Sequence, residues 1–131
     1  MPDPLPLVSL NHVARLTKRV EESTAFYRDV LGFRVLPRPD FTFGGAWLTN
    51  CGFAIHLIED PSIGDASGPV SARDNHLAFH VADMDAVQKR LQEHGVEHIV
   101  NTQSGTGMKQ IFFRDPDGHH VEVATYGAPG G

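Results

Sequence analysis

The stretch DNHLAFHV at residues 74–81 has a counterpart near the start of the chain, LNHVARLT at residues 10–17. Each stretch places an Asn-His pair in a run where alternate residues are apolar, which is the pattern of a half-buried strand. The next landmarks follow at matching distances, with a glycine twenty residues after the first histidine and another nineteen residues after the second. A fixed offset of this kind indicates an internal repeat, so the two halves are predicted to be one module written twice.

Each module is predicted to fold in the order β-α-β-β-β. Strand alternation, helical spacing of apolar residues and turn signals place the first module's strand, helix and three further strands at 8–16, 19–31, 33–36, 45–50 and 53–58. The second module begins with the strand around His76 and continues with a helix that Asp83 caps and Gly95 ends. Its later strands are predicted at 97–101, 109–114 and 120–125, with DPDG as a turn before the last.

The length of 131 residues fits a single domain, with modules at about 8–58 and 74–126 and a Gly-, Pro- and Ser-rich linker between them. A module of ~50 residues can hardly bury its own sheet face, so two must pack together, within the chain or across a dimer. We therefore predict an α+β fold in which two βαβββ modules form a curved, partly open barrel of mixed sheet. The tail GAPGG at 127–131 is expected to fray.

Composition excludes several classes of partner. A net charge of −5 and a pI near 5.8 leave no basic footprint for nucleic acid or an anionic membrane. The apolar stretches are far shorter than the ~20 residues of a membrane span, and MPDPLPLVSL lacks the features of a signal peptide. The single cysteine, Cys51, excludes an intrachain disulfide, so we expect a cytoplasmic protein.

Four residues stand out because the repeat relates them in pairs, His12 with His76 and His56 with Glu122. Alternation turns all four toward the concave side of the predicted sheets. Imidazole and carboxylate are the ligands of borderline divalent metals. A lone strand histidine is more often a hydrogen-bonded core or surface group, and Glu122 alone could be a polar residue of an edge strand. Because the whole set falls at repeat-related positions, we predict that His12, His56, His76 and Glu122 ligate one divalent ion of Zn, Ni, Co, Mn or Fe.

The segments LNHVARL, FYRDVLGFR, HLIED, DNHLAFHV and DPDGHHVEV resemble the vicinal oxygen chelate superfamily over about residues 8–126. This superfamily includes glyoxalase I, fosfomycin-resistance thiol transferases, epimerases and extradiol dioxygenases, and the chain is most similar to single-domain glyoxalase I-like proteins. The resemblance implies paired βαβββ modules, a homodimer, and metal ligands at the four residues named above. His56 stands where glyoxalase I usually has glutamate, and Ala14 and Phe112 stand where fosfomycin enzymes have threonine and tyrosine.

The leading hypothesis is a metal-dependent lyase or isomerase of the glyoxalase I type, acting on a small carbonyl compound or its thiol adduct through a metal-bound enediolate. Glu122 is the candidate catalytic base, and no cofactor-binding residue is assigned. The alternatives are a thiol transferase, an epimerase or a dioxygenase, the last keeping two histidines and one carboxylate if His56 does not ligate. A fourth is a non-catalytic drug- or metabolite-binding protein of the bleomycin-resistance type. The expected partners are a small-molecule substrate, a possible thiol cosubstrate and a second copy of the chain.

Overall fold

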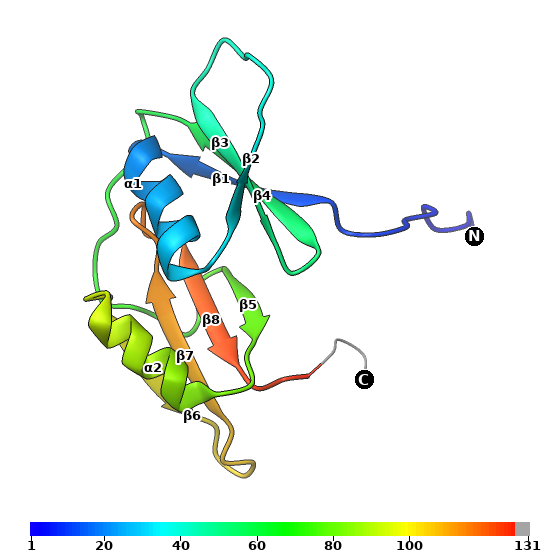
Figure 1. The fold of residues 1–131 in the computed structure, drawn as a ribbon. Coiled ribbons are helices and arrows are strands. Elements are labelled where there is room, and N and C mark those ends of the chain that lie inside the picture. The colour runs from blue at the N-terminus through cyan, green and yellow to red at the C-terminus, as the bar shows by residue number, and fades with distance from the viewer. Residues whose placement is uncertain (128–131) are drawn as a thin grey trace.

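In the computed structural model, which describes residues 1–127, the chain folds as two consecutive βαβββ units (Figure 1). The first unit comprises β1 (His12–Thr17), α1 (Val20–Ala25), the π-helical turn η1 (Phe26–Val30), β2 (Arg34–Leu36), β3 (Gly45–Asn50) and β4 (Phe53–Glu59). The second comprises β5 (His76–His80), α2 (Met84–Glu93), β6 (His98–Thr102), β7 (Lys109–Arg114) and β8 (His120–Ala124). The predicted α+β class and the order of elements are confirmed.

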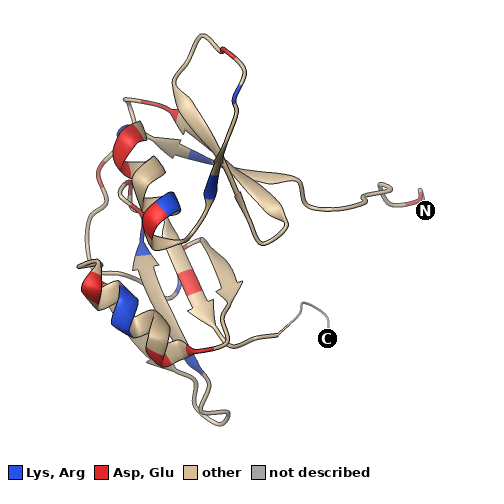
Figure 2. Cartoon of the chain, viewed as in Figure 1, with Lys and Arg blue, Asp and Glu red and all other residues tan. Residues whose placement is uncertain are grey.

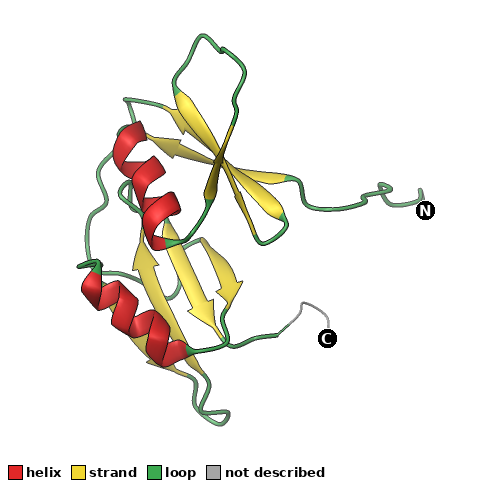
Figure 3. Ribbon diagram, in the orientation of Figure 1, coloured by secondary structure: helices red, strands yellow, loops and turns green. Residues whose placement is uncertain are grey.

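Each unit builds one four-stranded mixed sheet, and the strand orders are β1-β4-β3-β2 and β5-β8-β7-β6. In both sheets the first and last strands of the unit pair in parallel, and the other pairs are antiparallel. The two sheets are not joined into a closed barrel, which agrees with the partly open arrangement that the repeat predicts. The helices lie together on one side of the two sheets (Figure 3).

The repeat extends to the pairing of individual residues. Ala14 of β1 lies opposite His56 of β4, and in the second sheet Ala78 of β5 lies opposite Glu122 of β8. On the other side of each central strand, Trp47 pairs with His56 and Phe112 pairs with Glu122. Directly paired residues share a face of a sheet. Each sheet therefore presents one candidate ligand on its central strand with an aromatic ring beside it.

Two segments differ from the prediction by more than a shift of one residue at an end. β1 begins at His12 rather than residue 8, because its partner β4 begins opposite it and the last bond of the ladder joins Ala54 N–H to the Asn11 carbonyl. The residues before it run away from the sheet (Figure 1), and Val8 is fully exposed. The predicted helix 19–31 becomes α1 followed by the π-helical turn η1.

The core lies between the helices and the sheets in two buried clusters, one for each unit. Phe26, Leu31 and Phe79 pack against both clusters and so join the units. Charged residues gather on the helices and loops, whereas the sheets carry few (Figure 2). Among residues 1–127 there is no helix with the length and apolar character that crossing a membrane requires.

Candidate metal centre

The second sheet brings His76 and Glu122 together. His76 Nε2 lies 3.2 Å from Glu122 Oε1, and the Glu122 side chain is almost fully buried. His76 Nδ1 donates to the Asp74 carbonyl at 2.7 Å, because a carbonyl can only accept. A neutral His76 ring therefore turns its Nε2 lone pair toward a carboxylate oxygen. Two facing acceptors need a proton or a cation between them, and ligands bonded at about 2.0–2.2 Å to one ion lie at roughly this separation.

Tyr126, just beyond the end of β8, contacts the other oxygen of Glu122. Its hydroxyl donates to Glu122 Oε2 and accepts a bond of 2.8 Å from Gln110 Nε2. Burial raises the pKa of Tyr126, and the hydrogen bond to the Glu122 carboxylate raises it further. The phenol therefore stays protonated at neutral pH and can donate continuously. Glu122 Oε2 is thus occupied, while Oε1 faces His76.

The first sheet brings His12 and His56 together in a different way. Their rings stack with centroids 3.9 Å apart and planes 12° apart, and Trp47 stacks on the far face of His56 at 4.3 Å. A ring nitrogen binds a metal in the plane of its ring. Because the His12 and His56 planes are nearly parallel and separated, one ion cannot lie in both. His12 Nδ1 donates to Asn11 Oδ1 at 2.7 Å, which leaves its Nε2 free as an acceptor.

These contacts predict that His56 and His12 differ in their effect on metal binding. His56→Ala should weaken metal affinity much less than His12→Ala, because His56 supports the stack rather than completing a ligand set with His12. Burial, followed by the nearby His12 ring, lowers the pKa of His56, so its ring is neutral at pH 7 and can stack without charge repulsion. Metal titrations followed by calorimetry on both variants check this. Equal losses of affinity in the two variants would contradict it.

The four predicted ligands thus form two pairs, one in each sheet. Within residues 1–127, no group of three or more His, Cys, Asp or Glu side chains is close enough to hold a metal ion. The face of β1 that carries His12 is also uncovered, since Leu16 on the same face is 40% exposed. Within one chain the four candidate ligands therefore lie as two separate pairs, and the pair in the first sheet lies beside exposed apolar surface.

Sequence patterns did not reveal the residues that orient these candidate ligands. Asn11 was visible as part of the Asn-His pair, but Asp74 acts through its backbone carbonyl, which no sequence pattern marks.

Two other histidines have structural partners: His120 Nε2 accepts from the Ser71 N–H, and His119 Nε2 donates to the Leu16 carbonyl. The tail was expected to fray from residue 127, yet the Gly127 N–H donates to His80 Nδ1 at 2.9 Å; residues 128–131 lie outside the described part of the chain.

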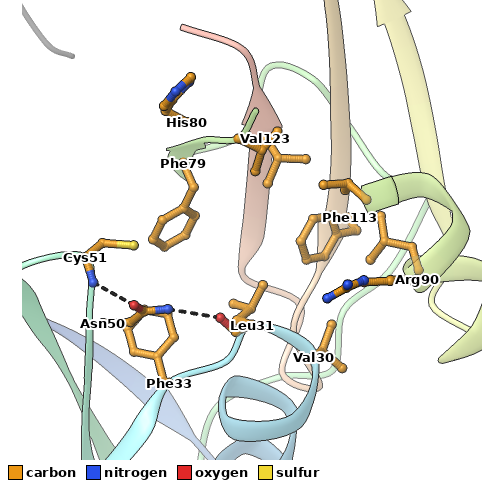
Figure 4. Close-up of a pocket in the computed structure, with 13 residues that line it drawn as sticks. Val30, Leu31, Phe33, Asn50, Cys51, Phe79, His80, Arg90, Phe113 and Val123 are labelled. Carbon is orange, nitrogen blue, oxygen red and sulfur yellow. Dashed lines mark hydrogen bonds between the residues drawn. The ribbon is translucent and has the colours of Figure 1, made fainter. Parts of the chain in front are cut away.

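A cavity of about 260 Å³ lies between the two units and away from both ligand pairs. Figure 4 shows the rings of Phe33, Phe79 and Phe113 around it, with the Arg90 side chain reaching toward Leu31. None of the four predicted ligands lines this cavity. Its lining is mostly apolar, with Asn50, Cys51, His80 and Arg90 as the polar members, and a pocket of this kind is suited to a small organic ligand.

Residues 9–123 match the family model described as the Glyoxalase/Bleomycin resistance protein/Dioxygenase superfamily. The chain belongs to this superfamily. Among its relatives, "Glyoxylase I 4" of Arabidopsis thaliana is 39% identical over 126 residues, which cover 92% of this chain and 72% of the plant protein. "Metallothiol transferase FosB" of Shouchella clausii is 32% identical over 124 residues, covering 88% of this chain and 79% of that protein.

Solved structures agree on the fold. A glyoxalase family protein from Enterococcus faecalis superposes with a TM-score of 0.74 at 27% identity, covering 88% of this chain and 96% of that one. A mutant of the fosfomycin resistance protein FosX from Listeria monocytogenes, complexed with Mn(II) and a dihydroxypropylphosphonic acid, gives a TM-score of 0.71 at 18% identity. That comparison covers 91% of this chain and 92% of the FosX chain, and it shows the fold alone.

Proposed function

We propose that this protein is a metal-dependent enzyme of the vicinal oxygen chelate superfamily, acting on a small molecule with two adjacent oxygen atoms. The observation that carries the proposal is the contact between His76 Nε2 and Glu122 Oε1, which lie 3.2 Å apart, a separation that a divalent ion held between the two atoms would explain. Imidazole with carboxylate suits Zn, Ni, Co, Mn or Fe. The similarity to a named glyoxalase and a named metallothiol transferase supports an enzyme of this kind.

The complete site is proposed to form between two copies of the chain. His76 and Glu122 of one copy would meet His12 of the other, because no third ligand approaches them within residues 1–127 of a single chain. The exposed apolar face around His12 would be covered in the same step, which removes Leu16 from water. A twofold dimer would hold two equivalent sites, each with two histidines and one carboxylate.

The residues of this chain have separable roles in the proposed reaction. A divalent ion held by His12, His76 and Glu122 would polarise the adjacent oxygens of the substrate. Phe112 packs edge-on against the His76 ring, with centroids 5.4 Å apart, and so helps to fix its orientation. The Glu122 carboxylate would take the proton from the hydroxyl-bearing carbon beside the substrate carbonyl and return it to the carbonyl carbon, while the hydroxyl proton passes to the former carbonyl oxygen. Isomerisation of a hemithioacetal, a glyoxalase I-like reaction, is the proposed activity.

Complementation between two inactive variants tests the shared site. Neither His12→Ala nor Glu122→Ala should turn over substrate alone. When the two are unfolded together and refolded as a mixture, about a quarter of the wild-type sites should be intact, because each mixed dimer contains one site with all its ligands. Metal content and turnover of a hemithioacetal, fosfomycin and a catechol measure the recovery. No recovery in mixtures that chromatography shows to be mixed dimers would place the site within one chain.

The cavity between the units supports a second candidate, a non-catalytic protein that binds an apolar metabolite. Its apolar lining and Arg90 favour a small carboxylate carrying a hydrophobic group. The same metal measurement separates the candidates. The enzyme should bind about one divalent ion per chain. A protein that retains no metal after supplementation, turns over none of the three substrates and binds a fluorescent carboxylate would be the binder.

A further inference from the structure

Tyr126 reaches Glu122 from outside the repeat, because it lies two residues beyond β8 in a segment with no element of its own. Its hydroxyl donates to Glu122 Oε2 and accepts from Gln110 Nε2. Gln110 Oε1 in turn accepts a bond of 2.9 Å from Asn101 Nδ2. Gln110 is also buried, with 8% of its surface exposed. The chain Asn101, Gln110, Tyr126 and Glu122 is therefore continuous, and every bond in it has a defined donor.

The direction of these bonds is fixed by chemistry. The Glu122 carboxylate can only accept, so Tyr126 must donate its one hydroxyl hydrogen to it. The hydroxyl oxygen is then free to accept from the Gln110 amide, which sets that amide with its nitrogen toward Tyr126. The remaining amide oxygen of Gln110 accepts from Asn101. Reversing any one side chain would place two donors or two acceptors against each other.

The backbone of Tyr126 is held separately from its hydroxyl. The N–H groups of Tyr126 and Gly127 both donate to His80 Nδ1, at 3.1 and 2.9 Å. Thr125 Oγ1 donates to the Val81 carbonyl at 2.9 Å. The segment after β8 is thus fastened to the end of β5, and this contact gives His80 a role outside the ligand set.

The register of the second sheet explains how one tyrosine reaches both places. His80, Ala124, Gln110 and Asn101 lie in a single row across β5, β8, β7 and β6. The Tyr126 backbone N–H donates to His80 on one side of Ala124, and the Tyr126 hydroxyl accepts from Gln110 on the other side. The side chain of Tyr126 must therefore pass over Ala124. A methyl group leaves room for that crossing, and Ala124 has no exposed surface. A large residue at position 124 would block it.

We propose that Tyr126, supported by Gln110, is a positioning residue that holds the Glu122 carboxylate with Oε1 turned toward His76 and the metal. This inference rests on the proposed function, since it assigns a role relative to the ligand Glu122. Partners that orient metal ligands commonly contribute 10–100-fold to metal affinity. Removing the hydroxyl would leave the carboxylate free to rotate away from His76 while the fold and the tail contacts with His80 remain.

The test is a metal titration of the apoprotein, which needs no substrate. Tyr126→Phe should weaken Mn²⁺ or Zn²⁺ binding by about 10–100-fold with little change in thermal unfolding of the apoprotein. Gln110→Leu should act in the same direction. Thr125→Val is the matched control, because it removes a hydrogen bond of the same segment without touching Glu122, and it should leave metal affinity unchanged.

A double-mutant cycle separates failure of this inference from failure of the proposed function. In a Glu122→Ala background, Tyr126→Phe should have no further effect on metal binding. If Glu122→Ala itself leaves metal affinity unchanged, the proposed metal site is wrong. If Glu122→Ala abolishes binding but Tyr126→Phe matches wild type or the Thr125→Val control, the site stands and the role of Tyr126 is overturned.

Discussion

Glu122→Gln is expected to lower turnover of a hemithioacetal by about 10²–10⁴-fold, because it removes the proposed proton acceptor without changing the shape of the side chain. The same change removes a negative charge from a site whose other proposed ligands are neutral imidazoles. Metal affinity should therefore fall by more than the roughly 10–100-fold that an orienting partner contributes. Initial rates on metal-loaded protein and calorimetric titration of the apoprotein measure the two effects.

Glu93→Gln provides the matched control for this variant. Glu93 ends α2, its side chain is 60% exposed, and it forms an ion pair with Lys89 at 3.9 Å. Both rate and metal affinity should be those of wild type. Turnover that survives Glu122→Gln unchanged while metal affinity falls would keep Glu122 as a ligand but remove it as the base. If both turnover and metal affinity survive Glu122→Gln, Glu122 is not part of the site.

The distances between repeats in the sequence predicted much of this geometry. The repeat predicted that His12 is equivalent to His76 and His56 to Glu122, and in the structure His56 and Glu122 occupy equivalent positions, each opposite an alanine of the first strand of its sheet. Period-2 patterning determines which face a residue occupies. It does not determine how the faces of different sheets are placed, so the separation of the two ligand pairs could not be predicted.

The orientation of side-chain rings and the long-range hydrogen bonds also could not be predicted from the sequence. The stack of His12 on His56 depends on side-chain rotation about two bonds, which no spacing encodes. Tyr126 lies between the last predicted strand, 120–125, and the tail that is expected to fray from residue 127, and only the closeness of β5 to β8 gives it a partner in His80. The turn signature DPDG predicted a local bend correctly, but its two aspartates do more than turn the chain.

Asp117→Ala is expected to cost about 3–5 kcal/mol of the free energy of unfolding, because this buried carboxylate joins the two units. Asp117 Oδ2 accepts from Ser23 Oγ at 2.8 Å, and Oδ1 accepts from the Lys18 N–H at 3.1 Å. Removing the carboxylate would leave these donors without their partner. Urea unfolding followed by circular dichroism measures the loss. Asp117→Asn, which can still accept hydrogen bonds, should lose less.

Asp65→Ala is the matched control, since Asp65 pairs from the solvent side with Lys18 and with Arg19, the side chain that also pairs with Asp117. Its Oδ1 lies 2.6 Å from Lys18 Nζ and 3.1 Å from Arg19 Nη2, and its side chain is 73% exposed. Exposed pairs of this kind contribute little, so the variant should lie within about 0.5 kcal/mol of wild type. A loss as large as that of Asp117→Ala would show that the cationic pairs, rather than the buried acceptor, join the units.

The contribution of Asp117 to the free energy of unfolding is expected to decrease as the pH falls. Burial acts to raise its pKa, but hydrogen bonds from Thr17, the Lys18 backbone and Ser23, with the charge of Arg19, outweigh burial and lower it. A carboxyl with a lowered pKa in the folded state stabilises fully above its unfolded pKa of about 3.9, and loses that contribution as pH falls through the folded value.

Asp115 has the opposite effect on how stability depends on pH. Burial raises its pKa even though the Tyr27 hydroxyl donates to it at 2.7 Å, so its ionised form costs stability at neutral pH and protonation relieves that cost. The stability of the wild type at low pH therefore combines opposing contributions from Asp117 and Asp115. Only the comparison with Asp117→Asn isolates the contribution of Asp117. The difference in unfolding free energy between wild type and Asp117→Asn should be constant above about pH 5 and shrink below about pH 4. A difference that grows on acidification would mean that the pKa of Asp117 is raised, and that its hydrogen bonds do not compensate for its burial.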